Sequence, residues 1–411
     1  MNLRLIAPDS VCASIALPMS KSITNRALLI SALCGGEPQV MRPALCDDTA
    51  VMVAALSQGD GTIDVGAAGT AMRFLTAYFA TRDGHSVSLD GTARMRQRPI
   101  GPLVTALRHL GARIDYMGQE GFPPLRITGA MMHGGDVVME GGVSSQFISA
   151  VMMILPTIGG GHITVKGDVV SLPYIHLTAS VMRHMGAMVD IVDGGVVVGN
   201  GYAGGDCMVE ADWSAAAPWY ALAALLPQSR LHLEGLAVDS IQGDARLVEL
   251  GRVLGIESHF DSTGVALDAS HFIGCCCSSY VDMTAMPDLA LSWVVLMCLL
   301  ERSFRMTGVR TLHLKESDRV EALRTELMKL GYVLKIESED AVSWYGERVP
   351  IGAQPPVIDP HDDHRLAMAL APAAVRFPGL VMKDAQVVSK SYPSYWRHLR
   401  QAGFEVSELA Q

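Results

Sequence analysis

The chain lacks the features that mark several common classes of protein. Its eight cysteines include no CxxC pair, and its 32 basic side chains are outnumbered by 42 acidic ones. The longest apolar run, Leu289 to Leu300, is well short of the roughly 20 residues that cross a bilayer. The residues Met1 to Ser10 contain an apolar run that is too short for a signal peptide. We therefore expect a cytosolic protein without a membrane partner.

The formal net charge of −10 limits the partners further. Nucleic acids and anionic membranes select basic proteins, so neither is expected as the main partner. Any site for an anion must then be a local pocket. The apolar fraction of 49% and the charged fraction of 18% are typical of a compact, ordered protein, and 411 residues fit two domains of about 200 residues each.

Three adjacent cysteines, Cys275, Cys276 and Cys277, lie in a strand-like stretch. Neighbouring strand residues point to opposite faces, so these thiols do not easily converge on one metal ion or pair with one another. We interpret them as small, mostly buried, reduced thiols. No metal site is expected.

What the chain does contain is an internal repeat. Six strongly apolar stretches, each opening on polar or small residues, recur at intervals of about 70 residues. They are Ser20 to Leu33, Ala67 to Ala80, Ser144 to Pro156, Ala211 to Pro227, Met286 to Leu300 and Asp363 to Val375. A helix that is apolar on nearly every face must be buried, and its first N–H groups then need acceptors. The six polar tips therefore predict converging anion sites and a multiply charged substrate.

Between these stretches lies a second pattern, an amphipathic helix that closes at a glycine and is followed by an alternating strand. Its copies are Leu103 to Tyr116, Leu177 to Val192, Arg246 to Phe260, Glu321 to Ile336 and Trp396 to Val406, with a weaker sixth copy at Ala50 to Val65. The closing glycines, where a helix C-terminus requires a left-handed residue, are Gly111, Gly186, Gly255, Gly331 and Gly403.

One repeat thus combines a buried helix, a strand, an amphipathic helix and further strands, and six repeats predict two α/β domains of three repeats each. Each domain is expected to be a prism of sheets with its buried helices inside. The N-terminal strand belongs with the C-terminal half, so we expect one domain of residues 1–17 plus 213–411 and a second of residues 18–212. The chain would then cross twice, in a hinge near Pro18 and Asp212, with the active site in the cleft between the domains.

The tips in the first half of the chain carry cations, hydroxyls and small residues that suit phosphate or carboxylate. The candidates are Lys21, Ser22 and Arg26; Gly69, Thr70 and Arg73; Arg94, Arg96 and Arg98 before Pro99; Ser144, Ser145 and Gln146; and Ser171 with Tyr174. We expect Pro99 to end a strand and start a helix. Helix capping, packing or solvated surface charge accounts for single members of each cluster equally well.

The tips in the second half add acids. Asp288 stands at a buried helix tip, where it is suited to accept a hydroxyl proton or simply to cap the helix. Lys315, Glu316, Asp318 and Arg319 fall within five residues, as a mixture of acid and cation or as a solvated helix start. In HDDHR we expect His364 and Arg365 to face a ligand while Asp362 or Asp363 caps the helix. Lys390 lies in a loop before the last amphipathic helix.

Taken together, PMSKSITNRALL, GTAMR, RPIG, VSSQF, SLPYI, QGD, PDLA, LKESDR, DDHR and SKSYP resemble the 3-phosphoshikimate 1-carboxyvinyltransferase (EPSP synthase) family in content and order, from Lys21 to Lys390. The resemblance implies two inside-out α/β domains. It also implies transfer of the enolpyruvyl group of phosphoenolpyruvate to the 5-hydroxyl of shikimate 3-phosphate, on the pathway to chorismate and the aromatic amino acids, without a cofactor. A monomer is expected, as is inhibition by glyphosate that competes with phosphoenolpyruvate.

Carried over by motif, Glu316 is the implied acid, Asp288 the implied base, and Lys21 a further catalytic group. The residues implied to bind shikimate 3-phosphate are Lys21, Ser22, Arg26, Ser144, Ser145, Gln146, Ser171, Tyr174, Asp288, Thr311 and Lys315. Those implied to bind phosphoenolpyruvate are Lys21, Gly69, Arg98, Gln146, Arg319, Arg365 and Lys390. Thr70, Arg73 and His364 are expected to support them.

Two positions depart from the family pattern. Ala67 and Thr311 each stand where the family commonly has asparagine, which puts the affinities in doubt but removes no proposed acid, base or cation. The sister enzyme that acts on UDP-N-acetylglucosamine is the main alternative. It uses a loop cysteine that RMRQRPIG, residues 94–101, does not contain. A relative that binds these ligands without turnover is a second alternative.

Overall fold

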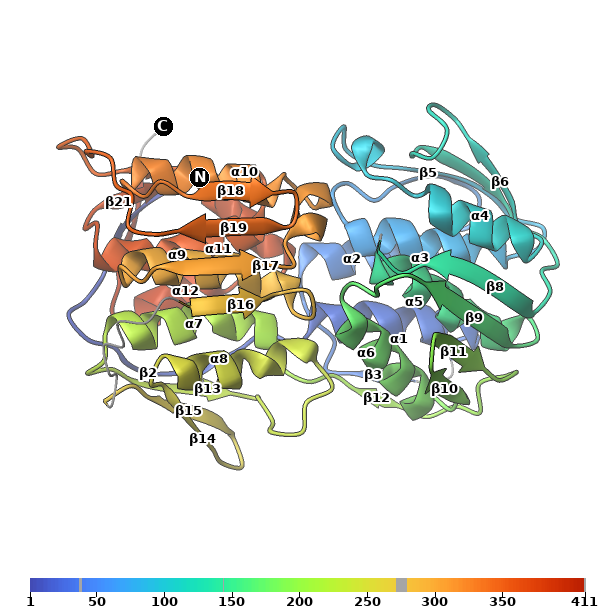
Figure 1. Ribbon diagram of the computed structural model, residues 1–411. Helices are drawn as coiled ribbons and strands as arrows, with labels where there is room; N and C mark the ends of the chain where they lie inside the picture. Colours follow the sequence, from blue (N-terminus) through green and yellow to red (C-terminus); the bar gives the residue numbers. More distant parts are fainter. Residues whose placement is uncertain (37–38, 143, 271–278, 410–411) are drawn as a thin grey trace. The chain divides into compact units, whose positions relative to one another are not determined.

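A computed structural model describes residues 1–36, 39–142, 144–270 and 279–409 of the chain (Figure 1). The interpretation of Cys275, Cys276 and Cys277 as buried thiols lies outside these residues. Within them the chain forms two compact units. Unit 1 comprises Met1–Pro18 and Glu210–Gln411, and unit 2 comprises Met19–Val209, so the chain passes between the units twice.

The repeat has a fixed topology of strand, buried helix, strand, amphipathic helix and two more strands. In one copy of unit 2 these are β4 (Gly61–Asp64), α3 (Gly69–Ala80), β5 (Ser86–Asp90), α4 (Gly101–His109), β6 (Arg113–Tyr116) and β7 (Leu125–Thr128). Strands β4 and β5 are parallel, and β7 lies antiparallel between β5 and β6. The next copy, with the same order, consists of β8 (Gly135–Glu140), α5 (Ser145–Ile154), β9 (Gly161–Lys166), α6 (Leu172–His184), β10 (Val189–Val192) and β11 (Gly195–Val198).

Unit 1 contains three such copies. In one of them unit 2 lies between the first strand and the first helix, and in another the last strand comes from the N-terminus of the chain. The first is β2 (Cys12–Ala16), α7 (Trp213–Leu225), β13 (Arg230–Glu234), α8 (Leu247–Val253), β14 (Glu257–Phe260) and β15 (Gly264–Asp268). The second is β16 (Ser279–Asp282), α9 (Ala290–Leu299), β17 (Phe304–Thr307), α10 (Arg319–Lys329), β18 (Lys335–Ser338) and β19 (Ala341–Trp344). The third is β20 (Val357–Ile358), α11 (His364–Leu370), β21 (Leu380–Met382), α12 (Tyr395–Gln401), β22 (Glu405–Leu409) and β1 (Asn2–Ile6).

The position of unit 2 in the chain explains the interruption. Strand β2 pairs in parallel with β13, although all of unit 2 lies between them in the sequence. Strand β1 pairs antiparallel with both β21 and β22, so the first residues of the chain complete the last sheet of unit 1.

The remaining copy in unit 2 is shorter than the others over the described residues. Strand β12 (Cys207–Met208) pairs in parallel with β3 (Val40–Met41), and helices α1 (Lys21–Leu33) and α2 (Asp47–Ser57) belong to the same copy. This sheet has two described strands, whereas the others have four. Helix α2 ends in an extended residue, Gln58, with no left-handed glycine next to it, which explains why its pattern is weak.

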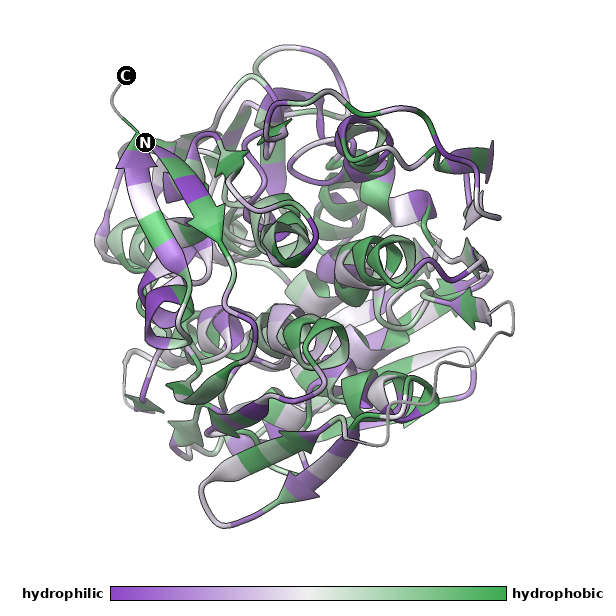
Figure 2. Cartoon of the chain, turned by 90° about the vertical axis from the view of Figure 1, so that its left-hand side faces the viewer, coloured by the Kyte–Doolittle hydropathy of each residue, from purple (hydrophilic) through white to green (hydrophobic). Residues whose placement is uncertain are grey.

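The six helices predicted to be buried form the cores of the two units. In each of α3, α5, α7, α9 and α11 all residues but one are buried, whereas α1 is buried at seven of its 13 residues. Figure 2 shows helices seen along their axes with mainly apolar residues, while the strands near the two termini alternate between polar and apolar ones. No described helix combines the length and the apolar character that crossing a membrane requires.

The amphipathic helices end as predicted. Each closing glycine has a positive φ, from 78° at Gly255 to 99° at Gly111. At Gly186 a Cβ atom would also lie 2.6 Å from the carbonyl oxygen of Gly204, so both the backbone conformation and the space require glycine there. One local expectation was wrong: the residues before Pro99 form a 3-10 turn, Met95–Gln97, and not a strand.

Candidate functional site

Arg319 stands at the centre of an ionic cluster in unit 1. It is the first residue of α10, whose N-cap Asp318 accepts a hydrogen bond from the backbone N–H of Glu321. The guanidinium donates to both oxygens of Asp363, with Nε 2.7 Å from Oδ2 and Nη2 3.2 Å from Oδ1. Its Nη1 lies 3.1 Å from Asp288 Oδ1 and its Nη2 lies 3.0 Å from Glu316 Oε2. One buried cation thus holds three carboxylates.

The charge balance around Arg319 fixes its protonation. Burial lowers the pKa of this guanidinium, but the carboxylates of Asp363, Glu316 and Asp288 outweigh that effect, so the pKa is raised. Arg319 therefore stays charged at every pH at which the protein is folded. It is 2% exposed, so water does little to screen these interactions.

Asp288 is held by two cations and does not serve as a plain helix cap. It lies in a 3-10 turn, Pro287–Leu289, directly before α9, and no side-chain cap bond is formed at the start of either helix. Its second oxygen, Oδ2, accepts a hydrogen bond from Arg365 Nη2 at 2.9 Å. The helix N-terminus and the two guanidiniums all favour the charged carboxylate that a general base requires.

Glu316 links this cluster to Lys390. Its Oε1 lies 3.6 Å from Lys390 Nζ, and both side chains are about a tenth exposed. Lys390 ends a 3-10 turn, Ala385–Lys390, that follows β21. The sequence motifs around Asp288, Glu316, Arg319, Arg365 and Lys390 are therefore brought together in unit 1, as charged groups within direct reach of one another.

Asp244 is a member of this cluster that the sequence analysis did not select. It is buried, and its carboxylate accepts a short hydrogen bond from the Ser214 hydroxyl, whose oxygen lies 3.4 Å from Arg365 Nη2. Burial raises the pKa of Asp244 to about 7, and the nearby Asp288 carboxylate adds to that rise, while Arg365 and Ser214 oppose it. Asp244 is thus an acid that titrates near neutral pH beside the candidate base.

Asp363 was expected only as a possible cap. It does cap α11, because it accepts a hydrogen bond from the backbone N–H of Arg365 at 2.9 Å, whereas Asp362 is exposed. Its pairing with Arg319 had no signal in the sequence, since the two residues are 44 positions apart. The QGD motif pointed to Asp244 only through the family resemblance.

In unit 2, Arg26 is buried at the meeting point of four helices. Its Nε donates to Thr178 Oγ1 at 2.6 Å, its Nη1 to the Ser22 carbonyl oxygen at 2.9 Å, and its Nη2 to Ser149 Oγ at 3.4 Å. The guanidinium also lies over the rings of Phe74 and Tyr174. Burial lowers the pKa of Arg26 to about 10, and the nearby Tyr174 opposes this shift. The predicted proximity of Ser22 and Arg26 is therefore seen, through the Ser22 backbone.

Two other arginines of unit 2, Arg73 and Arg98, lie at the tip of α3. A Cβ atom on Gly69 would lie 2.8 Å from Arg98 Cζ, so the buried Arg98 guanidinium packs directly on the glycine. Arg73 donates to the Gly69 carbonyl oxygen at 3.2 Å and to the Pro99 carbonyl oxygen at 3.1 Å. Gln146 of α5 reaches the same tip, with its Nε2 3.3 Å from Thr70 Oγ1.

The other candidates of unit 2 have distinct environments. Lys21 Nζ lies 2.9 Å from Oδ2 of the buried Asp48, a partner that the sequence analysis missed. Ser144 caps α5 through Gln146, and Ser145 is buried beside it. Ser171 precedes α6 with a left-handed φ of 57°, and its side chain forms no cap bond to the helix.

The remaining candidates lie on these same elements. Thr311 and Lys315 are half-buried on the segment between β17 and α10, and Ala67 is half-buried before α3. His364 is 1% exposed, so it packs inside unit 1 instead of facing solvent. Arg96 is an exposed surface charge that pairs with Asp90.

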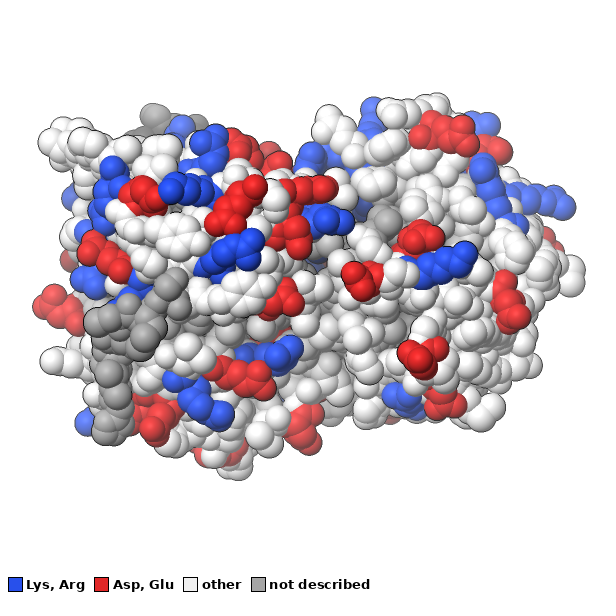
Figure 3. All heavy atoms as spheres, viewed as in Figure 1, with Lys and Arg blue, Asp and Glu red and all other residues white. Residues whose placement is uncertain are grey.

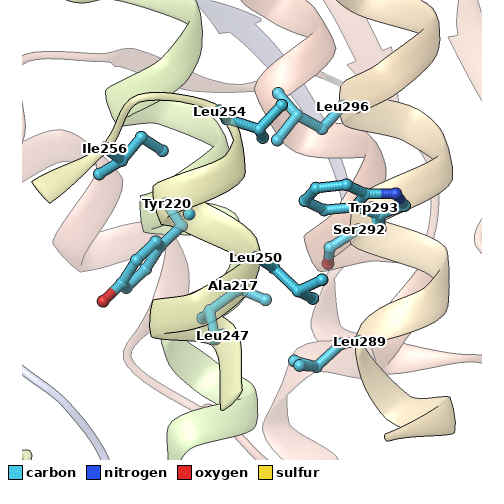
Figure 4. Close-up of a pocket in the computed structure, with 11 residues that line it drawn as sticks. Ala217, Tyr220, Leu247, Leu250, Leu254, Ile256, Leu289, Ser292, Trp293 and Leu296 are labelled. Carbon is cyan, nitrogen blue, oxygen red and sulfur yellow. The ribbon is translucent and has the colours of Figure 1, made fainter. Parts of the chain in front are cut away.

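Two further features of unit 1 carry no site for a charged substrate. A cavity of about 20 Å³ is lined mainly by apolar side chains, and Figure 4 shows Leu250 of α8 and Leu254 directly after it on the side opposite Trp293 and Leu296 of α9. It is far smaller than a typical ligand site. On the face shown in Figure 3, acidic and basic side chains are interspersed. Partly exposed ion pairs of unit 1 include Arg305 with Glu337 and Arg348 with Glu301. Over the described part of the chain no group of three His, Cys, Asp or Glu residues is arranged to hold a metal ion.

The chain matches one known protein family over most of its length. The family "EPSP synthase (3-phosphoshikimate 1-carboxyvinyltransferase)" matches residues 57–399. The chain belongs to this family. The expected family is thereby confirmed, and with it a transferase of the shikimate pathway, which the relatives favour over the enzyme that acts on UDP-N-acetylglucosamine.

Curated relatives and solved structures agree with the family. A 3-phosphoshikimate 1-carboxyvinyltransferase of Bacteroides fragilis is 47% identical over 411 residues and covers 99% of both chains. One of Syntrophobacter fumaroxidans is 37% identical and covers 96% of this chain and 98% of its own. The structure of the Acinetobacter baumannii EPSP synthase has a TM-score of 0.73 at 19% identity, over 99% of this chain and 100% of that one. The expected α/β fold class is therefore confirmed.

Proposed function

We propose that the chain transfers the enolpyruvyl group of phosphoenolpyruvate to the 5-hydroxyl of shikimate 3-phosphate and releases inorganic phosphate. The observation that carries this proposal is the cluster around Arg319. It sets two carboxylates, Asp288 and Glu316, among three cations within a chain of this family. Two acid–base groups beside several cations suit a reaction that moves protons on a substrate with a phosphate and a carboxylate.

Shikimate 3-phosphate is bound by hydroxyls, an amide and cations that are mostly in unit 2. The residues proposed for it are Lys21, Ser22, Arg26, Ser144, Ser145, Gln146, Ser171, Tyr174, Asp288, Thr311 and Lys315. The buried Arg26, with its fixed orientation between Thr178 and Ser149, suits a carboxylate or phosphate because little side-chain freedom remains to be lost on binding.

Phosphoenolpyruvate carries a carboxylate and a phosphate, and it is bound by Lys21, Gly69, Arg98, Gln146, Arg319, Arg365 and Lys390. Glycine at position 69 lets Arg98 approach the backbone at the tip of α3. Thr70 and Arg73 support that tip. His364, which is buried and directly precedes Arg365, is assigned a supporting role. Glyphosate, a phosphonate, competes with phosphoenolpyruvate for the same cations.

The first chemical step is an addition. Asp288 takes the proton of the 5-hydroxyl, and the hydroxyl oxygen forms a bond to C2 of phosphoenolpyruvate. At the same time Glu316 gives a proton to the C3 methylene. Arg319 and Lys390 favour the charged form of Glu316. Glu316 therefore becomes an acid only when the anionic groups of the substrate take over contacts of these two cations.

The second step is an elimination. A methyl proton returns to the Glu316 carboxylate, and the electrons of that C–H bond form the double bond between C2 and C3 again. The bond from C2 to the phosphate oxygen breaks, and inorganic phosphate leaves with the proton that Asp288 took in the first step. The cations Lys21, Arg98, Arg319 and Lys390 stabilise the charge that develops on the leaving phosphate. The reaction proceeds without a metal or an organic cofactor, in a cytoplasmic monomer.

The test compares acceptors. Phosphate release from phosphoenolpyruvate is measured with shikimate 3-phosphate and, separately, with UDP-N-acetylglucosamine at equal concentrations. Phosphate release with shikimate 3-phosphate and none with UDP-N-acetylglucosamine supports the proposal. Release with UDP-N-acetylglucosamine, or binding of shikimate 3-phosphate without release, supports one of the two alternatives instead.

A further inference from the structure

Glu326 is a fully buried carboxylate on α10 that the proposed reaction does not use. Both of its oxygens accept hydrogen bonds from Lys329 Nζ, at 2.8 and 2.7 Å. Its Oε2 also accepts from the backbone N–H of Asp359 at 2.9 Å, and its Oε1 lies 2.9 Å from His361 Nε2. A buried carboxylate requires such partners. Two of the three partners come from one short segment after β20.

That segment has an unusual backbone. His361 and Asp362 both have left-handed φ values, 51° and 55°, which residues with a Cβ atom rarely adopt. The His361 N–H donates to Asp359 Oδ1 at 2.8 Å, and the Asp363 N–H donates to the Pro360 carbonyl oxygen at 2.9 Å. Two consecutive residues in this region persist only where surrounding contacts hold them.

Helix α10 provides contacts on both sides of the strained residues. Arg319 and Glu326 are seven residues apart, or about two helical turns, and so lie on the same face of α10. Glu326 binds Asp359, which lies before the strained pair, and His361, the first residue of the pair. Arg319 binds Asp363, which follows the pair directly and caps α11. The turn is thus held between two anchors on one helix.

We propose that Glu326 is a positioning residue that clamps the turn of residues 359–362, and thereby orients Asp363 and Arg365 toward Arg319 and Asp288. The inference rests on the proposed function, because Arg365 is one of the cations assigned to phosphoenolpyruvate. Without the clamp the strained pair relaxes, and the first turn of α11 moves with it. Binding of phosphoenolpyruvate then weakens more than binding of shikimate 3-phosphate.

Three variants of the full chain test this clamp. Glu326→Gln keeps the shape of the side chain but removes the charge that attracts Lys329 and His361. His361→Asn removes the contact to Glu326 while asparagine still tolerates a left-handed φ. Glu321→Gln is the matched control, because Glu321 is exposed on the same helix and pairs with Arg324. Amide hydrogen exchange over residues 357–365 and steady-state kinetics are measured for each.

We expect Glu326→Gln to speed exchange over residues 357–365 and to raise the KM for phosphoenolpyruvate at least 10-fold. The KM for shikimate 3-phosphate should change less than 3-fold. His361→Asn should show the same pattern with a smaller effect, and Glu321→Gln should match the parent chain. Faster exchange with an unchanged KM for phosphoenolpyruvate, or equal loss of affinity for both substrates, overturns the positioning role. Exchange that Glu326→Gln leaves unchanged overturns the clamp itself. A parent chain that releases no phosphate refutes the proposed function, whereas the exchange measurement still judges the clamp.

Discussion

Arg319 and Asp363 form a two-bonded ion pair that is almost entirely buried, with Nε 2.7 Å from Oδ2 and exposures of 2% and 0%. The same guanidinium bonds to Asp288 and Glu316, the proposed base and acid. The positions of both reactive carboxylates therefore depend on one side chain. Arg319 therefore holds together the tip of α11 and both carboxylates proposed for the reaction.

Replacing Arg319 by methionine is expected to destabilise unit 1 and to abolish turnover. The change leaves three carboxylates near one another without their shared cation, and loss of one partner of a buried pair costs about 3–5 kcal/mol. Urea unfolding measures the loss. Arg324→Met is the control on the same helix, since its exposed pair with Glu321 is worth less than about 1 kcal/mol. Equal free energies of unfolding for the two variants would show that the ion pairs of Arg319 do not stabilise unit 1.

Asp244 makes stability fall as pH rises toward neutrality. Its pKa is about 7 in the folded chain against an ordinary value of 3.8, so the folded state binds more protons than the unfolded state between these values. The stabilisation is complete below about pH 4 and is lost as the pH rises through 7. One pKa unit corresponds to about 1.4 kcal/mol, so we expect the free energy of unfolding to fall by about 1 kcal/mol or more between pH 5 and pH 8.

Asp244→Asn should remove most of this pH dependence, as measured by urea unfolding at pH 5 and pH 8. Asp261→Asn is the comparison, because hydrogen bonds from Thr263 lower the pKa of Asp261 to about 2 and it does not titrate in this range. If the Asp244→Asn chain keeps the full pH dependence of the parent, the assignment of that titration to Asp244 is wrong.

Gly69→Ala is expected to weaken phosphoenolpyruvate binding. The new methyl group would meet the Arg98 guanidinium, with Cβ 2.8 Å from Cζ, and force it away from the tip of α3. We predict a KM for phosphoenolpyruvate raised about 10-fold, equivalent to about 1.4 kcal/mol, with less change in the KM for shikimate 3-phosphate. Gly59→Ala has open space around its Cβ and serves as control. An unchanged KM for phosphoenolpyruvate in Gly69→Ala would remove Arg98 from that site.

Glu316→Gln should separate binding from chemistry. Glutamine keeps a hydrogen-bond acceptor for Arg319 but cannot transfer a proton, so shikimate 3-phosphate should bind normally in calorimetry while kcat falls at least 100-fold. The same experiment tests the alternative of a relative that only binds ligands. Turnover equal to that of the parent chain would exclude Glu316 from the mechanism.

The repeat was predictable because short stretches of the sequence, such as apolar runs and helix-ending glycines, indicate it. Apolar runs such as the one in α9 and the glycine at position 186 each report a local requirement for burial or for a left-handed backbone. The order of strands within each sheet was not predictable in this way. The pairing of β2 with β13 joins segments separated by the whole of unit 2.

The sequence predicted members of the charged cluster where they stood in a motif at a helix tip, as Asp288 and Arg365 do. Their partners were not found. In unit 1, Asp244 bonds to Ser214, and in unit 2, Asp48 bonds to Lys21 and Thr178 to Arg26. Each of these contacts joins two different elements, so it follows from tertiary packing and not from a local motif. Glu326 carried no sign of its role, because a glutamate on an amphipathic helix ordinarily faces solvent.

The most direct test of the central claim is phosphate release in three mixtures, with both substrates, with phosphoenolpyruvate alone and with shikimate 3-phosphate alone. Enolpyruvyl transfer predicts steady release only when both are present, with one enolpyruvyl ether formed for each phosphate. Release from phosphoenolpyruvate alone at the same rate, or no release from the complete mixture, would contradict it.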